Sequence, residues 1–365
     1  MSGNSSSLLT EQDVLLALRG VKDPDIQRDL VDLGMIKDIR IGPESLDLTV
    51  NLTTPACPLK AKIEADVREA LARNLGTARH VTVHMSADVR GKGVIEKGDI
   101  PGVKNVIAVG SGKGGVGKST MAAAIAYGLQ SYGANVGLMD ADVYGPSIPH
   151  LVGATGRPMA QGERIQPIEA NGLRLMSIGF LVEPERAVIM RGPMLHGIMQ
   201  QFLHQVEWGE LDYLVIDLPP GTGDVPLTLS QSLPLTGAVV VCTPQEVALL
   251  DARRAINMFS QLKVPMLGII ENMSYFDPPG GGERIYLFGH GGARRMAESM
   301  NVPFLGEVPQ ILNIRERGDI GKIHETLESD SPARPHLLGV VEQLAAQISI
   351  RNLKAPKMPK LEIIG

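Results

Sequence analysis

The residues with the clearest chemical pattern lie at 112–120, where a glycine-rich turn carries two lysines and two hydroxyl side chains. The spacing Gly-x4-Gly-Lys-Ser is typical of a phosphate-binding loop between a strand and a helix. Glycines let backbone N–H groups converge on phosphate oxygens without a Cβ in the way, and the helix N-terminus adds partial positive charge. The sequence therefore predicts a nucleotide site formed by Gly112, Lys113, Gly114, Gly115, Val116, Gly117, Lys118, Ser119 and Thr120.

Within this loop, Lys118 is expected to reach the β- and γ-phosphates and Ser119 to bind Mg²⁺. Further along the chain, Asp140 and Asp142 follow one apolar run, and Asp217 ends another, Leu-Val-Ile-Asp, in the Walker B pattern that holds Mg²⁺. We interpret Asp142 as the residue that orients the attacking water and Asp140 as a Mg²⁺-shell or switch residue, with a solvated turn as the alternative for both.

A rigid loop, Pro-Pro-Gly-Thr-Gly-Asp over 219–224, follows the Walker B aspartate, and its Gly221 could sense the γ-phosphate. These candidate residues must be brought together by the elements around them. Since parallel strands present ligands at their carboxyl ends, a sheet of parallel strands would place the phosphate loop, Asp140, Asp142 and Asp217 at one edge.

Apolar runs that alternate with helical patterns over 105–350 predict such a doubly wound, mostly parallel α/β sheet. The expected strands are 106–109, 136–139, 173–178, 213–216, 238–242, 266–270 and a short one near Phe304. The expected helices are 119–131, 194–206, 247–262, 292–300 and 335–350.

A small α+β domain is predicted ahead of this sheet, over 8–88. Its expected elements are a helix over 8–19 with Thr10 as N-cap, a hairpin of 33–41 and 46–52, a helix over 61–75 and a strand over 80–85. Residues 89–104 read as a linker and 351–365 as a C-terminal tail, whose two prolines disfavour a helix.

Cys57 is the one residue of the first domain whose side chain could take part in chemistry. It stands just before a helix, where the helix dipole favours the thiolate, although a small buried core residue is an equally open interpretation. The other cysteine, Cys242, lies within an apolar strand and is expected in the core.

The composition narrows the class of protein. The formal net charge of −5 and the aromatic content of 4% argue against a general nucleic-acid binder. Two cysteines form no disulfide framework, and no signal-peptide pattern or long apolar run is present, so a cytoplasmic protein without a membrane partner is expected.

The extra Lys113 makes the loop similar to the deviant Walker A loop of the MinD/ParA/nitrogenase-reductase class. Segments 140–147, 217–224, 243–245, 271–275 and 288–292 further resemble the Mrp/ApbC iron–sulfur cluster carrier ATPases, and most of 8–88 resembles the MIP18 type of assembly domain. The resemblance implies a slow, Mg²⁺-dependent ATPase that acts as a homodimer on apo iron–sulfur client proteins. It also implies that Lys113 reaches the partner's phosphates and that Asn272, with the segment near Pro309, binds the adenine.

The chain departs from these carriers at the expected Cys-x-x-Cys, where Pro278 and Gly281 stand instead of cysteines. Cys57 is then the one plausible thiol ligand of a cluster, with His290 a conceivable contributor. Three functions stay open on the sequence. They are an ATPase that carries and transfers iron–sulfur clusters, a nucleotide-gated dimeric switch that carries none, and an ATPase that acts on DNA or membrane.

Overall fold

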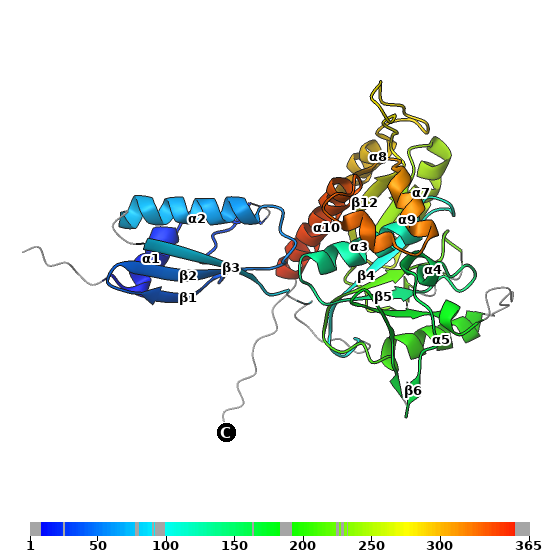
Figure 1. Cartoon of the computed structure of the whole chain (residues 1–365), viewed down its shortest axis with the longest axis horizontal. Helices are drawn as coiled ribbons and strands as arrows, with labels where there is room; N and C mark the ends of the chain where they lie inside the picture. The colour runs from blue at the N-terminus through cyan, green and yellow to red at the C-terminus, as the bar shows by residue number, and fades with distance from the viewer. Residues whose placement is uncertain are drawn as a thin grey trace, which may run out of the picture. The chain divides into compact units, whose positions relative to one another are not determined.

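The computed structural model describes residues 9–24, 26–76, 80–89, 91, 99–162, 164–182, 192–223, 226–227, 230–231 and 233–354. The chain divides into two compact units, 1–89 and 90–365, which Figure 1 shows in blue and in cyan to red. Asp224, half of the expected linker (residues 90 and 92–98) and the tail beyond Lys354 lie outside the described residues. None of the helices in the described parts is long and apolar enough to cross a membrane.

The first unit is a three-stranded sheet with two helices. Its elements are α1 (Glu11–Leu18), β1 (Ile36–Ile41), β2 (Ser45–Leu52), α2 (Lys60–Leu75) and β3 (His80–Ala87). β2 is the central strand, antiparallel to β1 and parallel to β3. The expected N-cap is confirmed, because the Thr10 hydroxyl accepts from the Asp13 N–H while the Asp13 carboxylate accepts from the Thr10 N–H.

The second unit holds an eight-stranded sheet in the order β13-β12-β11-β4-β10-β5-β9-β8. Every adjacent pair is parallel except β8 with β9. The predicted fold class, a mostly parallel α/β sheet behind a small α+β domain, is confirmed. The strands are β4 (Val103–Ser111), β5 (Val136–Asp140), β8 (Ile168–Ala170), β9 (Leu173–Ser177), β10 (Leu211–Asp217), β11 (Gly237–Cys242), β12 (Met266–Asn272) and β13 (Phe304–Val308).

Helices cover both faces of this sheet, as Figure 1 shows. On one face α3 (Lys118–Ser131) packs against β4, β5 and β10, and α10 (Arg334–Lys354) packs against α3, β12 and β13. On the other face α5 (Gly192–His204), α7 (Glu246–Gln261) and α8 (Gly292–Met300) bury apolar residues with alternate positions of the strands. Strands buried on both faces explain the continuous apolar runs in the sequence.

The structure adds short elements that the sequence did not reveal. They are α4 (Ile148–Val152), α9 (Leu312–Asp319), the turns η1 (Ile178–Phe180) and η2 (Ile323–Leu327), and the two-residue strands β6 (Ala160–Gln161) and β7 (Arg164–Ile165). Elements this short carry too few residues to show a hydrophobic period. The last helix also continues to Lys354, the last residue that the structure describes, rather than ending at residue 350.

Candidate active site

The phosphate loop joins β4 to α3 at the carboxyl edge of the sheet. Gly115 and Gly117 adopt positive φ angles of 79° and 83°, a conformation in which a Cβ would be strained. At position 112 there is no room for a larger residue than glycine, because a Cβ there would lie 2.2 Å from the Asp251 carbonyl carbon of α7. Open space surrounds Gly114 and Gly115, so the loop backbone is accessible to an incoming phosphate.

Lys118 stands at the first position of α3 and is 7% exposed. Its ammonium group lies 2.6 Å from Asp217 Oδ1, 3.2 Å from Ser119 Oγ and 3.8 Å from Asp142 Oδ2. The structure thus brings together the lysine, the hydroxyl and two aspartates singled out in the sequence. In this arrangement the lysine is paired with the Walker B carboxylate.

Asp140 and Asp217 end the adjacent strands β5 and β10, in register with each other, and both are fully buried. Asp140 accepts hydrogen bonds from the Asp142 N–H, the Ile148 N–H and the Ser177 hydroxyl at 3.0–3.2 Å. These donors occupy both of its oxygens. Asp140 therefore fixes the loop between β5 and α4, an anchoring role that the sequence did not indicate.

When ionised, the three aspartates of the site carry more negative charge than the one lysine beside them can balance. Burial, and then the charge of Asp217, raises the pKa of Asp140 to about 8. Burial also raises the pKa of Asp142 and of Asp217, in both cases against the lowering effect of Lys118. With one lysine beside three acids, the site favours a divalent cation when these groups are ionised.

The donor set fits Mg²⁺. Asp217 Oδ2 is buried and has no hydrogen-bond partner among the described residues, and the Ser119 hydroxyl lies beside the same lysine. Mg²⁺ in nucleotide sites keeps several waters and binds one or two carboxylates together with substrate phosphates. Asp217 and Ser119 are thus the residues of this chain that could hold it.

The loop after Asp217 contacts the phosphate loop directly. Gly221 has a φ of 94°, and its N–H donates to the Ser111 carbonyl at 2.8 Å. A residue tied to the strand end that opens the phosphate loop is well placed to respond to a γ-phosphate.

A cavity of about 520 Å³ opens beside Gly117 and Thr120, and it holds both expected adenine-contacting positions, Asn272 and Pro309. The Asn272 side-chain amide donates to the Val116 carbonyl at 2.9 Å, so this residue also supports the phosphate loop. The sequence missed the other walls of the cavity. These come from the short helices α4 and α9 and include Leu151, Ile314 and Arg315.

Gly117→Ala is expected to weaken ATP binding by about tenfold or more. A Cβ at this position would lie 2.2 Å from the Asn272 amide nitrogen, and the positive φ strains any side chain, an effect of about 1–3 kcal/mol. Isothermal calorimetry with ATP measures the change. Gly339→Ala in α10, where a Cβ meets nothing within 4 Å, is the control and should bind ATP normally. Unchanged ATP affinity of the Gly117 variant would contradict the assigned geometry.

Lys113 lies in the loop, where its backbone carbonyl accepts from the Ser111 hydroxyl at 2.9 Å. In the described part of the chain its ammonium group forms no ion pair with a carboxylate, unlike Lys118. Among the described residues, therefore, no carboxylate neutralises its charge.

The two cysteines occupy different environments. Cys242 is buried in β11, and burial raises the pKa of its thiol to about 12, which confirms a core residue. Cys57 is half-buried in the first unit.

The ring centroid of His290 lies 4.4 Å from that of Tyr286. Among the residues that the structure describes, no group of three or more His, Cys, Asp or Glu side chains could hold a metal ion.

The segment that stands in place of the cysteine pair is a closed loop. Phe276 and Ile285 exchange backbone hydrogen bonds at 2.8 and 2.9 Å, and Arg284 binds Asp277 through two bonds of 2.8 and 3.0 Å. The Arg284 guanidinium also lies 3.6 Å from the ring centroid of Tyr275. The base of this loop is thus held by backbone hydrogen bonds, an ion pair and a cation–π contact.

Comparison with known proteins agrees with this geometry. The family described as NUBPL iron-transfer P-loop NTPase matches residues 102–345, and the family described as iron-sulfur cluster assembly protein matches residues 11–85. The iron-sulfur cluster carrier protein of Synechocystis is 46% identical over 353 residues, which cover 95% of this chain and 100% of that protein.

The chain is also similar to solved structures. A nucleotide-binding protein from Archaeoglobus fulgidus, solved in complex with ADP, is 44% identical with a TM-score of 0.56 and covers 62% of this chain and 90% of its own. The cell division ATPase MinD of Pyrococcus furiosus shares the fold, with a TM-score of 0.51 at 19% identity over 66% of this chain and 97% of its own. The chain therefore belongs to the NUBPL-type family of iron-transfer P-loop NTPases and carries an iron–sulfur cluster assembly domain before its NTPase domain.

Proposed function

We propose that the protein is a cytoplasmic, homodimeric ATPase that binds iron–sulfur clusters as cargo and transfers them to apo client proteins. The observation that carries this function is the whole-length similarity to a protein named iron-sulfur cluster carrier, in a chain whose phosphate loop, Lys118 and Asp217 are assembled for ATP. ATP is the proposed substrate and Mg²⁺ the proposed cofactor.

Hydrolysis begins with an exchange of partners at Lys118. The backbone amides of the loop bind the phosphates, and Lys118 leaves Asp217 for the β- and γ-phosphates. Asp217 and Ser119 are then available to hold Mg²⁺, which neutralises phosphate charge when bound. Asp142 orients the attacking water, and Lys113 of a second subunit stabilises the charge of the transition state. Slow turnover suits a reaction that must wait for dimerisation.

Cargo binding rests on Cys57. A homodimer supplies two such thiols, and the remaining ligands come from glutathione, from the client protein or from His and Asp side chains. A cluster with four ligands needs donors beyond this pair. Cys242 is excluded as a ligand by its burial.

A second function is favoured by one observation. In the loop 276–285, an ion pair and a backbone bridge between the two ends of the loop stand where the cysteine pair was expected. Such a loop suits a surface for partner proteins more than a set of cluster ligands. In this alternative the protein is a nucleotide-gated dimeric switch that positions assembly factors and carries no cluster.

Cys57→Ala separates the two functions. If the protein is a carrier, anaerobic reconstitution with iron and sulfide should give cluster absorbance and acid-labile sulfide, and the variant should lose both while its ATP hydrolysis is retained. Cys242→Ala is the matched control and should keep the cluster. Absence of a cluster in the unaltered protein, with client maturation supported by Cys57→Ala but not by Lys118→Ala, would favour the switch.

A further inference from the structure

The short helix α4 connects the cavity of about 520 Å³ to the carboxylates of the site. At its start the Ile148 N–H donates to Asp140 Oδ2 at 3.2 Å, and the Asp142 N–H donates to Asp140 Oδ1 at 3.0 Å. Asp142 Oδ1 in turn accepts from the Gly145 N–H at 3.3 Å, within the same turn. A shift of α4 would therefore be passed on to Asp142 through the carboxylate of Asp140.

Two glycines bring α4 into contact with α9. The two helices lie side by side (Figure 1), and both line the cavity, α4 with His150 and Leu151 and α9 with Ile314 among others. Gly153 directly follows α4, and a Cβ there would lie 2.5 Å from the Gly321 carbonyl oxygen. A Cβ at Gly321, just past α9, would lie 2.7 Å from the Gly153 Cα. Since both obstacles are backbone atoms, a side chain at either position would push the helices apart.

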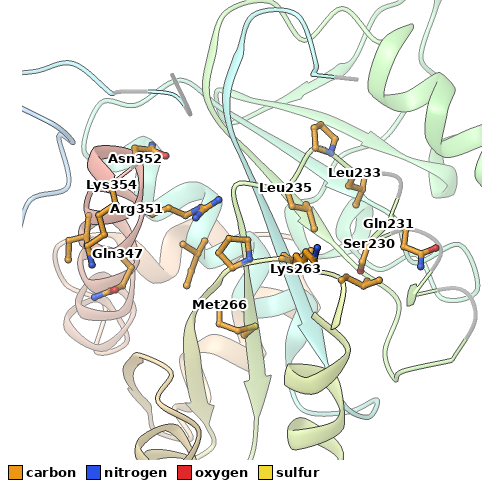
Figure 2. Close-up of a pocket in the computed structure, with 16 residues that line it drawn as sticks. Ser230, Gln231, Leu233, Leu235, Lys263, Met266, Gln347, Arg351, Asn352 and Lys354 are labelled. Carbon is orange, nitrogen blue, oxygen red and sulfur yellow. The ribbon is translucent and has the colours of Figure 1, made fainter. Parts of the chain in front are cut away.

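The contact, more than the backbone conformation, requires glycine at this place. Gly153 and Gly321 have φ angles of 67° and 74°. Lys263, just past the end of α7, has a φ of 57°, so a residue with a side chain can take such a conformation after a helix. Figure 2 shows that the Lys263 side chain has space, because it lines a separate cavity of about 780 Å³. Between Gly153 and Gly321, by contrast, the two backbones are in contact.

Ion pairs hold the end of α9 that meets Gly153. The Arg317 guanidinium lies 2.6 Å from Glu325 Oε2, and the Lys322 ammonium group lies 2.9 Å from Glu325 Oε1. The Lys322 N–H also donates to the Arg317 carbonyl at 2.7 Å. These contacts join the end of α9 to η2, so α9 offers α4 a fixed side.

We propose that Gly153 and Gly321 are positioning residues for ATP hydrolysis, through which a base bound in the cavity holds Asp142 in place. The base packs against the cavity-lining side chains of α4 and α9. It seats α4 on α9 at the glycine contact, and Asp140 passes this position on to Asp142. Binding energy from a part of the substrate that does not react is thus used to orient the attacking water. The inference rests on the proposed ATPase function and on the proposed role of Asp142.

The test compares ATP with ribose 5′-triphosphate, which has the same phosphates but no base, on the full chain with Mg²⁺. The unaltered protein should have a kcat about 10²-fold higher for ATP, because a misplacement of about 1 Å costs a factor of this size. Gly153→Ala should lower kcat for ATP to the value for ribose 5′-triphosphate and leave the latter unchanged. The two losses should not add, since both act through the same contact. Gly321→Ala should behave in the same way.

Gly162→Ala is the matched control. Its φ of 64° is close to that of Gly153, but a Cβ there meets nothing within 4 Å, so this variant has similar backbone strain without the helix contact. It should keep the full difference between the two triphosphates. Unfolding temperatures show which variants fold, and the comparison on the unaltered protein tests the proposal without any variant.

Several results would overturn the proposal. Equal kcat values for the two triphosphates in the unaltered protein would show that the base does not position Asp142. A folded Gly153→Ala variant that raises KM for ATP at unchanged kcat would limit the glycine contact to binding, and an equal fall of kcat for both substrates would indicate a general loss of structure. Absence of ATP hydrolysis in the unaltered protein would instead contradict the ATPase function itself, and the positioning role with it.

Discussion

The Lys118→Ala variant is expected to bind ATP poorly and to hydrolyse it roughly 10³-fold more slowly, since one lost donor to transition-state charge alone slows a reaction 10²–10³-fold. Lys118 is the one cation within 4 Å of Asp217 and Asp142 in the described structure, at 2.6 and 3.8 Å. Without it the phosphates lose a charged ligand and meet buried carboxylates instead. Binding of a fluorescent ATP analogue and release of phosphate measure the two effects separately.

A second lysine–aspartate pair on the same two strands provides the matched control. Lys104 lies near the start of β4, and its ammonium group is 2.9 Å from Asp212 near the start of β10. Lys104→Ala removes an equivalent contact at the other end of the strands and should change hydrolysis less than about twofold, as expected for a partly exposed ion pair. Retention of hydrolysis within tenfold in Lys118→Ala, in a folded protein, would exclude the proposed phosphate contact.

Lys113→Ala is expected to keep ATP affinity within about threefold and to lower hydrolysis by about 10³-fold, the smaller end of the range for a charge supplied by a partner subunit. The expectation follows from the environment of the lysine, which forms no ion pair within the described subunit although it belongs to the phosphate loop. Lys113→Arg, which keeps a charge at the same place, should recover part of the activity. The comparison needs turnover rates and dissociation constants on the same preparations.

Mixing two inactive proteins tests the role of the partner directly. Lys118→Ala subunits lack the phosphate-binding lysine but keep Lys113. Lys113→Ala subunits keep Lys118 but lack Lys113. A mixed dimer therefore contains one complete site, and the mixture should hydrolyse ATP faster than either protein alone. A mixture no faster than its components, or an equal loss of binding and turnover in Lys113→Ala, would refute a contribution across the dimer.

Sequence reasoning succeeded where chemistry is encoded by neighbouring residues. The phosphate loop is a continuous stretch, so its glycines, Lys118 and Ser119 could be predicted together. Asp140 and Asp217 could be predicted because each ends an apolar strand, and parallel strands bring their carboxyl ends to one edge.

The parts that could not be predicted depend on contacts between distant residues. Gly112 is a glycine because the Asp251 backbone of α7 approaches it, which no local pattern reveals. The same holds in part for Asp140, which accepts a hydrogen bond from the distant Ser177 in addition to those from Asp142 and Ile148 in the loop that follows it. The cavity walls from α4 and α9 were missed because these helices are too short to show a period.

The closed base of the loop 276–285 has a consequence for how this family can change. The backbone bridge between Phe276 and Ile285 fixes the entry and exit of the loop, while Gly280, Gly281 and Gly282 at its tip take positive φ angles and contact little. The tip can therefore be exchanged without altering β12 or Asn272, which supports the phosphate loop. Substitutions at the tip are therefore expected to change the surface of the loop and to leave ATP binding as it is.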